Sequence, residues 1–340
     1  MKIKRADIER ILIVCAAALV VVLALKGGGK TTSQVLVEQT NIPIEETAAA
    51  THAETVSTTV FYEDGEGYLV PVTRKVEKTD GIAKATLGLM VKSSQNDMQA
   101  ARLGLRTVIP ENTTFEIDIQ KGRANVNLSK EALSCASAQQ EALMVDAVTN
   151  AMTCFGTVKE VTLEFDGQKR SKLTYGTDVS GVFNGGNLNL ESVATFADDA
   201  ELVKLYFPSQ TGRLLVPVTR AVFSDADPTT AVLELAKGPK SDSGLERALP
   251  ENCGIKGVTM KDGVVTVNFS SEFQQAMETT DGGQQAIRAI LFTCSQFPGV
   301  KKVEILVDGQ KMEKQPESTA TFINQEEEVM AQYPGVVETD

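Results

Sequence analysis

The chain has 340 residues, of which 42% are hydrophobic and 23% are charged, and its net charge at pH 7 is −12. The first 30 residues hold six basic and two acidic side chains, so the remainder, with 27 Lys plus Arg against 43 Asp plus Glu, is near −16. Such an acidic surface repels nucleic acid, which we exclude as a partner. The length allows two or three ordinary domains, each large enough to bury its own core.

The amino terminus has the pattern of a membrane segment. A basic N-region, residues 1–10, precedes an uninterrupted apolar run over residues 11–25, which Lys26 ends. Fifteen helical residues span about 22 Å, against about 30 Å of hydrocarbon, and Arg10 and Lys26 can snorkel to narrow that gap. We expect an uncleaved signal anchor in the cell membrane, single-pass, with the amino terminus inside and the later domains extracytoplasmic.

Two other interpretations of this segment are weaker. A cleaved signal peptide is the competing one, since its apolar region is about 7–15 residues long. However, Ala24-Leu25-Lys26 places Lys at the critical position of a cleavage site. A lipid-modified cysteine should follow the apolar stretch, whereas Cys15 lies inside it, directly after Val14.

Residues 26–57 are rich in Gly, Thr, Ala and Glu with little periodic apolar signal, which predicts a flexible spacer. The chain then repeats itself, and the two copies span residues 58–169 and 203–311. LVPVTR at 69–74 recurs at 215–220, IPEN at 109–112 matches LPEN at 249–252, and VNLS at 126–129 matches VNFS at 267–270. FDGQK at 165–169 likewise matches VDGQK at 307–311. Because the copies lie 140 to 146 residues apart, they are two tandem domains and not a solenoid of short repeats.

The second copy shows the expected elements most clearly. Alternating apolar residues predict strands over 203–207, 214–218, 265–269 and 303–307, and Pro217 restricts its strand to a sheet edge or a bulge. Asp227-Pro228 predicts the start of a helix that Gly238-Pro239 ends, and Asp262-Gly263 predicts a hairpin turn. A second helix has Ile287, Ile290, Leu291 and Cys294 on one face. We predict the same plan for the first copy, and hence an α/β fold of the α+β type: two tandem small domains, each a mixed β-sheet packed against two α-helices.

Two segments lie outside the repeats. The connecting tract, residues 170–202, contains Val179, Val182, Phe183 and Leu190, which predict that it partly packs. The tail, residues 312–340, is acidic and is expected to fray.

These motifs resemble the GerM domain family of sporulation and spore germination. The second copy fits closely, including Gly238-Pro239, Pro250 and Asp308-Gly309, while the first lacks the Gly-Pro pair and has Gly156-Thr157 in place of Pro298-Gly299. The resemblance implies an endospore-forming Firmicute and a role between mother cell and forespore. It implies a non-enzymatic protein whose partners are proteins of a forespore-spanning ring or channel complex. Tethered family members are usually lipid-anchored, so the absence of a lipobox is a departure.

The residues themselves carry no recognisable catalytic constellation, and we expect no catalytic, cofactor or metal site. The only histidine, His52, lies in the spacer, which excludes histidine-based triads and metal sites. GGGKTT at 27–32 resembles a phosphate loop, but Ala24 stands where the first glycine is required. Glu160, Glu164 and Glu304 are expected to face solvent.

The recurrent polar residues have structural explanations. Ser129 and Ser270 suit helix caps. Asn127 and Asn268 suit local hydrogen bonds to the backbone, with a binding role as the alternative.

Four cysteines, Cys135, Cys154, Cys253 and Cys294, lie in the part expected outside the cytoplasm, where disulfides can persist. Cys154 and Cys294 occupy matching helix positions, so free core thiols are our expectation. A Cys253–Cys294 bridge is the alternative.

Three functions follow for comparison. The first is a membrane-tethered scaffold that helps assemble a sporulation complex and supports spore development or germination. The second is a binding module for peptidoglycan in cortex synthesis or germination, although the chain has no Trp and five Tyr for stacking on sugars. The third, a wall hydrolase, lacks a marked carboxylate pair.

Overall fold

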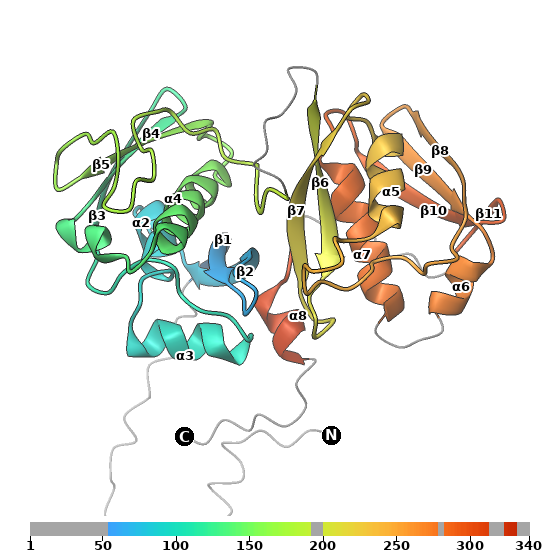
Figure 1. Ribbon diagram of the computed structural model, residues 1–340, viewed down its shortest axis with the longest axis horizontal. Helices are drawn as coiled ribbons and strands as arrows, with labels where there is room; N and C mark the ends of the chain where they lie inside the picture. The colour runs from blue at the N-terminus through green and yellow to red at the C-terminus, as the bar shows by residue number, and fades with distance from the viewer. Residues whose placement is uncertain (1–53, 192–199, 278–281, 313–322, 332–340) are drawn as a thin grey trace, which may run out of the picture. The chain divides into compact units, whose positions relative to one another are not determined.

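A computed structural model describes residues 54–191, 200–277, 282–312 and 323–331, which belong to one compact unit of the chain (Figure 1). The predicted signal anchor and nearly all of the spacer lie outside the described residues. Among the helices in the described ranges, none is both long enough and apolar enough to cross a membrane.

The first repeat has two small sheets. An antiparallel hairpin consists of β1 (Thr55–Glu63) and β2 (Leu69–Glu77). The second sheet has the order β3-β4-β5 and consists of β3 (Phe115–Gln120), β4 (Arg123–Leu128) and β5 (Glu160–Phe165). β4 and β5 are parallel and therefore need a crossover, which contains α4 (Ala138–Thr153). The remaining elements are α2 (Ile82–Gly88), α3 (Ser94–Arg102) and the 3₁₀ helix η1 (Lys130–Ser134).

The second repeat follows the same order. Its hairpin consists of β6 (Glu201–Pro208) and β7 (Leu215–Val222), and α5 (Pro228–Lys237) follows. Its other sheet, in the order β11-β10-β9-β8, consists of β8 (Ile255–Lys261), β9 (Val264–Phe269), β10 (Lys302–Val307) and β11 (Gln310–Lys311). The crossover from β9 to the parallel β10 contains α6 (Glu272–Met277) and α7 (Gly282–Ser295). A last helix, α8 (Glu326–Ala331), packs on β2 of the first repeat.

The predicted α+β class is confirmed, and the structure adds that each N-terminal hairpin is a sheet of its own. The reason lies in Pro71 and Pro217, the third residues of the two LVPVTR copies. Their carbonyl groups point away from the partner strand of the hairpin. Pro71 accepts a hydrogen bond from the side chain of Asn324, and Pro217 accepts one from the side chain of Asn189. A proline has no N–H to donate on that side, and within the described residues the outer edges of β2 and β7 carry only isolated bridges, at Thr73 and Thr219.

The turns and caps predicted for the second repeat are present. Asp227 caps α5 by accepting a 2.7 Å hydrogen bond from the N–H of Thr230, and Gly238 ends the helix with φ of 85°. Asp262 and Gly263 turn the β8–β9 hairpin with φ of 53° and 83°. Both values lie in the left-handed region, which suits the Asp-Gly turn that the sequence predicts.

The first repeat departs from the shared plan at α3, which has no counterpart in the second repeat. Ser93 caps α3, Asp97 lies in its first turn and Arg102 in its last. These are ordinary helix signals, but the prediction of the same plan for both copies did not include the extra helix. In the second repeat the corresponding stretch between α5 and β8 is irregular.

The segments outside the repeats are more ordered than predicted. In the connecting tract Val179 is buried as expected, whereas Val182 is 48% exposed. The expectation that the tail frays is wrong for residues 323–331: Asn324 is 1% exposed, and α8 buries Val329. Arg74, Lys75 and Arg288 form ion pairs with the three consecutive glutamates that begin α8, which offsets their mutual repulsion.

Two apolar cores follow the duplication. The first packs Tyr62, Met144 and Phe165 at its centre, and the second packs Phe207, Phe269 and Phe273. Phe269 and Phe273 stack with their ring centroids 4.5 Å apart.

Candidate functional site

The repeated asparagines have matching structural roles. The side-chain oxygen of Asn127 accepts a hydrogen bond from the N–H of Gly167 at 2.9 Å, and Asn268 does the same for Gly309 at 2.9 Å. Each asparagine therefore fixes the Asp-Gly turn after the neighbouring parallel strand. This is the local hydrogen-bonding role that the sequence favours.

The repeated serines differ from their predicted role as helix caps. The Ser129 hydroxyl accepts from the N–H of Thr114, and the Ser270 hydroxyl accepts from the N–H of Gly254. Both join the end of one strand to the loop before the adjacent strand. Hydrogen bonds to the same hydroxyls lower the pKa values of Glu131 and Glu272, each two residues further on.

The strand carboxylates form surface ion pairs. Glu160 lies 2.6 Å from Arg123, and Glu304 lies 2.7 Å from Lys302 and 3.0 Å from Lys311. Hydrogen bonds from those two lysines lower the pKa of Glu304, which keeps it ionised and unsuited to act as a general acid.

All four described cysteines are free thiols. The alternative bridge between Cys253 and Cys294 is absent. Burial raises the pKa of Cys294 to about 12 and the pKa values of Cys135 and Cys253 to about 11, so these thiols are poor nucleophiles at neutral pH.

The expectation of a buried Cys154 is wrong. It follows the last residue of α4 and is exposed, whereas Cys294 lies within α7 and is buried. The two matching cysteines therefore differ in exposure because α7 continues past its cysteine and α4 does not.

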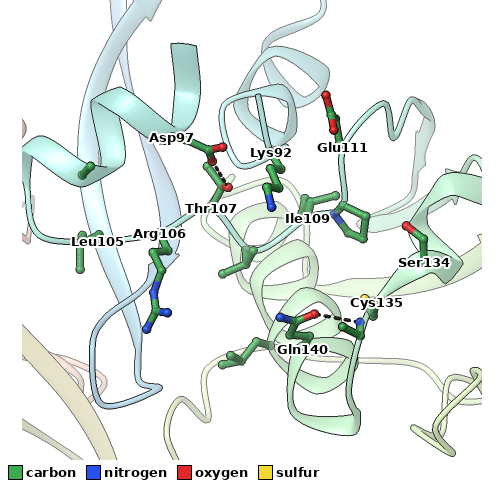
Figure 2. A pocket seen from close by; sticks show the side chains of 15 residues that line it. Lys92, Asp97, Leu105, Arg106, Thr107, Ile109, Glu111, Ser134, Cys135 and Gln140 are labelled. Carbon is green, nitrogen blue, oxygen red and sulfur yellow. Dashed lines mark hydrogen bonds between the residues drawn. The ribbon is translucent and has the colours of Figure 1, made fainter. Parts of the chain in front are cut away.

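A cavity with a volume of about 690 Å³ and a chemically varied lining lies in the first repeat. Figure 2 shows that α3, the following segment Leu105–Glu111 and the start of α4 surround it. Two of its polar side chains are already engaged: Asp97 accepts a 2.5 Å hydrogen bond from the Thr107 hydroxyl, and Gln140 accepts from the N–H of Ala136. Since α3 supplies one wall, the second repeat has no equivalent.

Two groups in the lining, the Lys92 ammonium and the Cys135 thiol, define what the cavity presents. The side chain of Lys92 extends toward the middle of the cavity in Figure 2, and its ammonium has no hydrogen-bond or ion-pair partner within the described residues, although its backbone N–H donates to the carbonyl of Ile109. Cys135 lies in the wall with a strongly raised pKa and no nearby base among the residues that line the cavity. The cavity therefore offers a cation and an apolar wall to a partner.

Within the described ranges, no group of three or more His, Cys, Asp or Glu side chains is placed to hold a metal ion. His52 and the GGGKTT segment lie outside the described residues.

Fold and surface together define a class: a tandem α+β protein whose repeated residues maintain turns and strand ends. The Germane family model, described as sporulation and spore germination, matches residues 59–171 and 204–313. The chain therefore belongs to the Germane family.

A sequence match and a structure match each cover most of the chain. It is 29% identical over 294 residues to the spore germination protein GerM of Bacillus subtilis (strain 168), an alignment that spans 83% of this chain and 80% of that protein. The solved structure of the tandem GerMN domains of the sporulation protein GerM from Bacillus subtilis superposes with a TM-score of 0.68 at 26% identity, covering 80% of this chain and 99% of that one. Homology of this extent supports a role in sporulation or germination.

Two short segments outside the repeats also match each other, which the sequence motifs did not reveal. Leu188-Asn189-Leu190-Glu191 and Ile323-Asn324-Gln325-Glu326 share an aliphatic-Asn-x-Glu pattern, 135 residues apart. Each follows one repeat, so the duplication extends beyond the segments compared above.

Proposed function

We propose that the protein is a non-enzymatic, membrane-tethered extracytoplasmic component that helps assemble a sporulation complex between mother cell and forespore. The observation that carries this proposal is the match of both repeats, in tandem, to a sporulation protein across four fifths of each chain. The basic N-region and apolar run of residues 1–25 support the tether.

The test is deletion of the gene in a sporulating host, followed by fractionation of the envelope complex that joins the two cells. We expect incomplete assembly in the deletion strain and recovery with the wild-type gene. Normal assembly without the gene would exclude the scaffold role. Retention of the purified protein on peptidoglycan, at the level of a known wall binder, would favour the alternative binding function.

The cavity beside α3 allows a sharper version of this test. Lys92→Glu reverses the free cation without breaking a described contact, so the fold should be unchanged. Lys261→Glu, on β8 of the second repeat, is a matched control because it too is an exposed lysine with no described partner. If the cavity receives an acidic partner, only the Lys92 variant should fail to restore assembly.

The tether has a separate test. Intact mass measurement of the protein from membranes shows whether residues 1–25 are retained. Extraction at alkaline pH, which removes peripheral proteins, should leave an anchored chain in the membrane, and release into the supernatant would contradict the proposal.

A further inference from the structure

The two aliphatic-Asn-x-Glu segments run along the hairpins in a reciprocal way. We call residues 188–191 the first clasp and residues 323–326 the second clasp. The first clasp, which follows the first repeat, bridges β7 of the second repeat through Leu190 and Thr219. The second clasp, which follows the second repeat, bridges β2 of the first through Gln325 and Thr73. Each repeat thus ends on the hairpin of the other.

The clasp asparagines make identical sets of hydrogen bonds. Asn189 accepts from the N–H of Leu69 at 2.8 Å and donates to the carbonyls of Leu69 at 2.9 Å and Pro217 at 2.7 Å. Asn324 accepts from the N–H of Leu215 at 2.8 Å and donates to the carbonyls of Leu215 and Pro71, both at 2.8 Å. Exchanging the two LVPVTR copies converts one set into the other.

In each clasp the amide oxygen of the asparagine accepts one hydrogen bond and its NH₂ group donates two. Both asparagines have φ near +50°, a left-handed conformation that Asn tolerates better than most residues. Each asparagine touches both hairpins at once, because one of its bonds reaches the other repeat's proline carbonyl. Neither repeat alone supplies the complete set of acceptors.

The clasp glutamates repeat the pattern with the arginine of LVPVTR. Arg220 holds Glu191 with two bonds, at 2.7 and 2.8 Å, and Arg74 holds Glu326 at 2.8 Å. Again the first clasp binds the second hairpin and the second clasp binds the first. β2 and β7 also pack together, and Leu214 and Val216 near the start of β7 lie in the core of the first repeat.

We infer that the hairpin edge and clasp of each repeat form a self-complementary interface whose partner is a second repeat of the same kind. In such an isologous contact the same surface is used on both sides, so two copies close on each other and leave no free copy of that surface. In this chain the tandem neighbour already occupies it. Contacts of this type therefore do not link successive chains into a ring or filament. This assignment stands on the repeats themselves and does not depend on the sporulation role.

The test separates the covalent link between the repeats from their contacts. A protease site is inserted into the full chain within residues 192–199, after the first clasp, and a tag is placed at the carboxyl terminus. After cleavage of the folded protein in detergent, the tagged half is captured and the retained amino-terminal half is measured over time. We expect the two halves to stay together.

Asn189→Ala with Asn324→Ala removes six hydrogen bonds at the clasps, of which the bonds to Pro217 and Pro71 join the two repeats. Release should become roughly ten-fold faster or more. Asn127→Ala with Asn268→Ala is the matched control, since those asparagines bond within their own repeats; its release rate should equal that of the parent. Glu191→Gln with Glu326→Gln is a milder variant, to be used if the alanine pair does not fold when uncut.

Two results would overturn the inference. Rapid separation of the cleaved parent would show that the linker alone holds the repeats together. Equal release by the clasp variants and the parent would show that the clasps do not form the interface. The uncut parent and the uncut clasp variants should show the same state of association in sedimentation experiments.

Discussion

Arg220 offers the sharpest test of how the repeats are stabilised. Its guanidinium makes five hydrogen bonds: two to the Glu191 carboxylate, one each to the carboxylate and carbonyl of Glu234, and one to the carbonyl of Gly238. The three side chains are only 10–14% exposed. Arg220→Met keeps the apolar stem but leaves the largely buried Glu191 carboxylate without its counter-charge, whereas Glu234 keeps its ion pair with Lys237.

Removing one partner of a buried ion pair costs about 3–5 kcal/mol. Because the site retains some contact with solvent, we expect a loss near the lower end, about 3 kcal/mol, in the free energy of unfolding. Arg74 makes three side-chain bonds, to Glu326, Tyr62 and Gln99, and faces one carboxylate, so Arg74→Met should cost less, about 2 kcal/mol. Adding Glu191→Leu to Arg220→Met should recover part of the loss, since the carboxylate that the first change leaves unpaired is then removed and Glu234 still pairs with Lys237.

Urea unfolding followed by circular dichroism measures these differences as shifts of the midpoint. Arg247→Met is the control: Arg247 is exposed and donates only to the carbonyls of Ala236 and Lys237, so its loss should stay below about 1 kcal/mol. If Arg220→Met unfolds within error of the wild type, or if Arg74→Met is the more damaging change, the ion-pair network does not have the role described.

Three further outcomes are expected. Burial raises the pKa of Asp64, so its contribution to stability is complete below the unfolded-state pKa of about 4 and is lost as the pH rises through the folded-state pKa. Asp64→Asn keeps an acceptor for the N–H groups of Glu66 and Tyr68. This variant should therefore flatten the pH dependence of the urea midpoint in that range of pH. Among the four described cysteines Cys154 should react first with a thiol alkylating agent at pH 8, even though surrounding atoms raise its pKa, and equal rates measured by mass spectrometry would contradict the burial of Cys135 and Cys294. Asn268→Ala should lower the free energy of unfolding by about 1 kcal/mol through loss of its bond to Gly309, and an unchanged urea midpoint would argue against that role.

Much of the fold could be predicted because its signals are local. Asp227-Pro228, Gly238 and Asp262-Gly263 each fix the backbone through their own conformational preferences, and the structure has the cap, stop and turn where these residues lie. The duplication then transfers each signal from one copy to the other. The same transfer concealed α3, because its cap at Ser93 has no match in the second copy.

The clasps could not be predicted in the same way, because their partners are distant in sequence. Asn324 bonds to residues 109 and 253 positions away, and the acidic run after it reads as solvated tail unless Arg74 and Lys75 are known to lie opposite. Cys154 shows the converse limit. Matching positions in two repeats predict matching burial, but α4 ends two residues earlier than α7 relative to the matching cysteines, and Cys154 is exposed.

The residues that the repeats share and those that they do not share have different roles. LVPVTR and the clasp residues appear twice and bind each other, so neither copy of that surface is available to another molecule. A partner must then bind to faces that the closure leaves open. The α3 cavity, with the free ammonium of Lys92, has no second copy in the described part of the second repeat, which lacks a counterpart of α3. The described residues hold two similar domains and one cavity bounded by α3, so we expect a single partner molecule per chain at that cavity, not the two that the duplication alone would suggest.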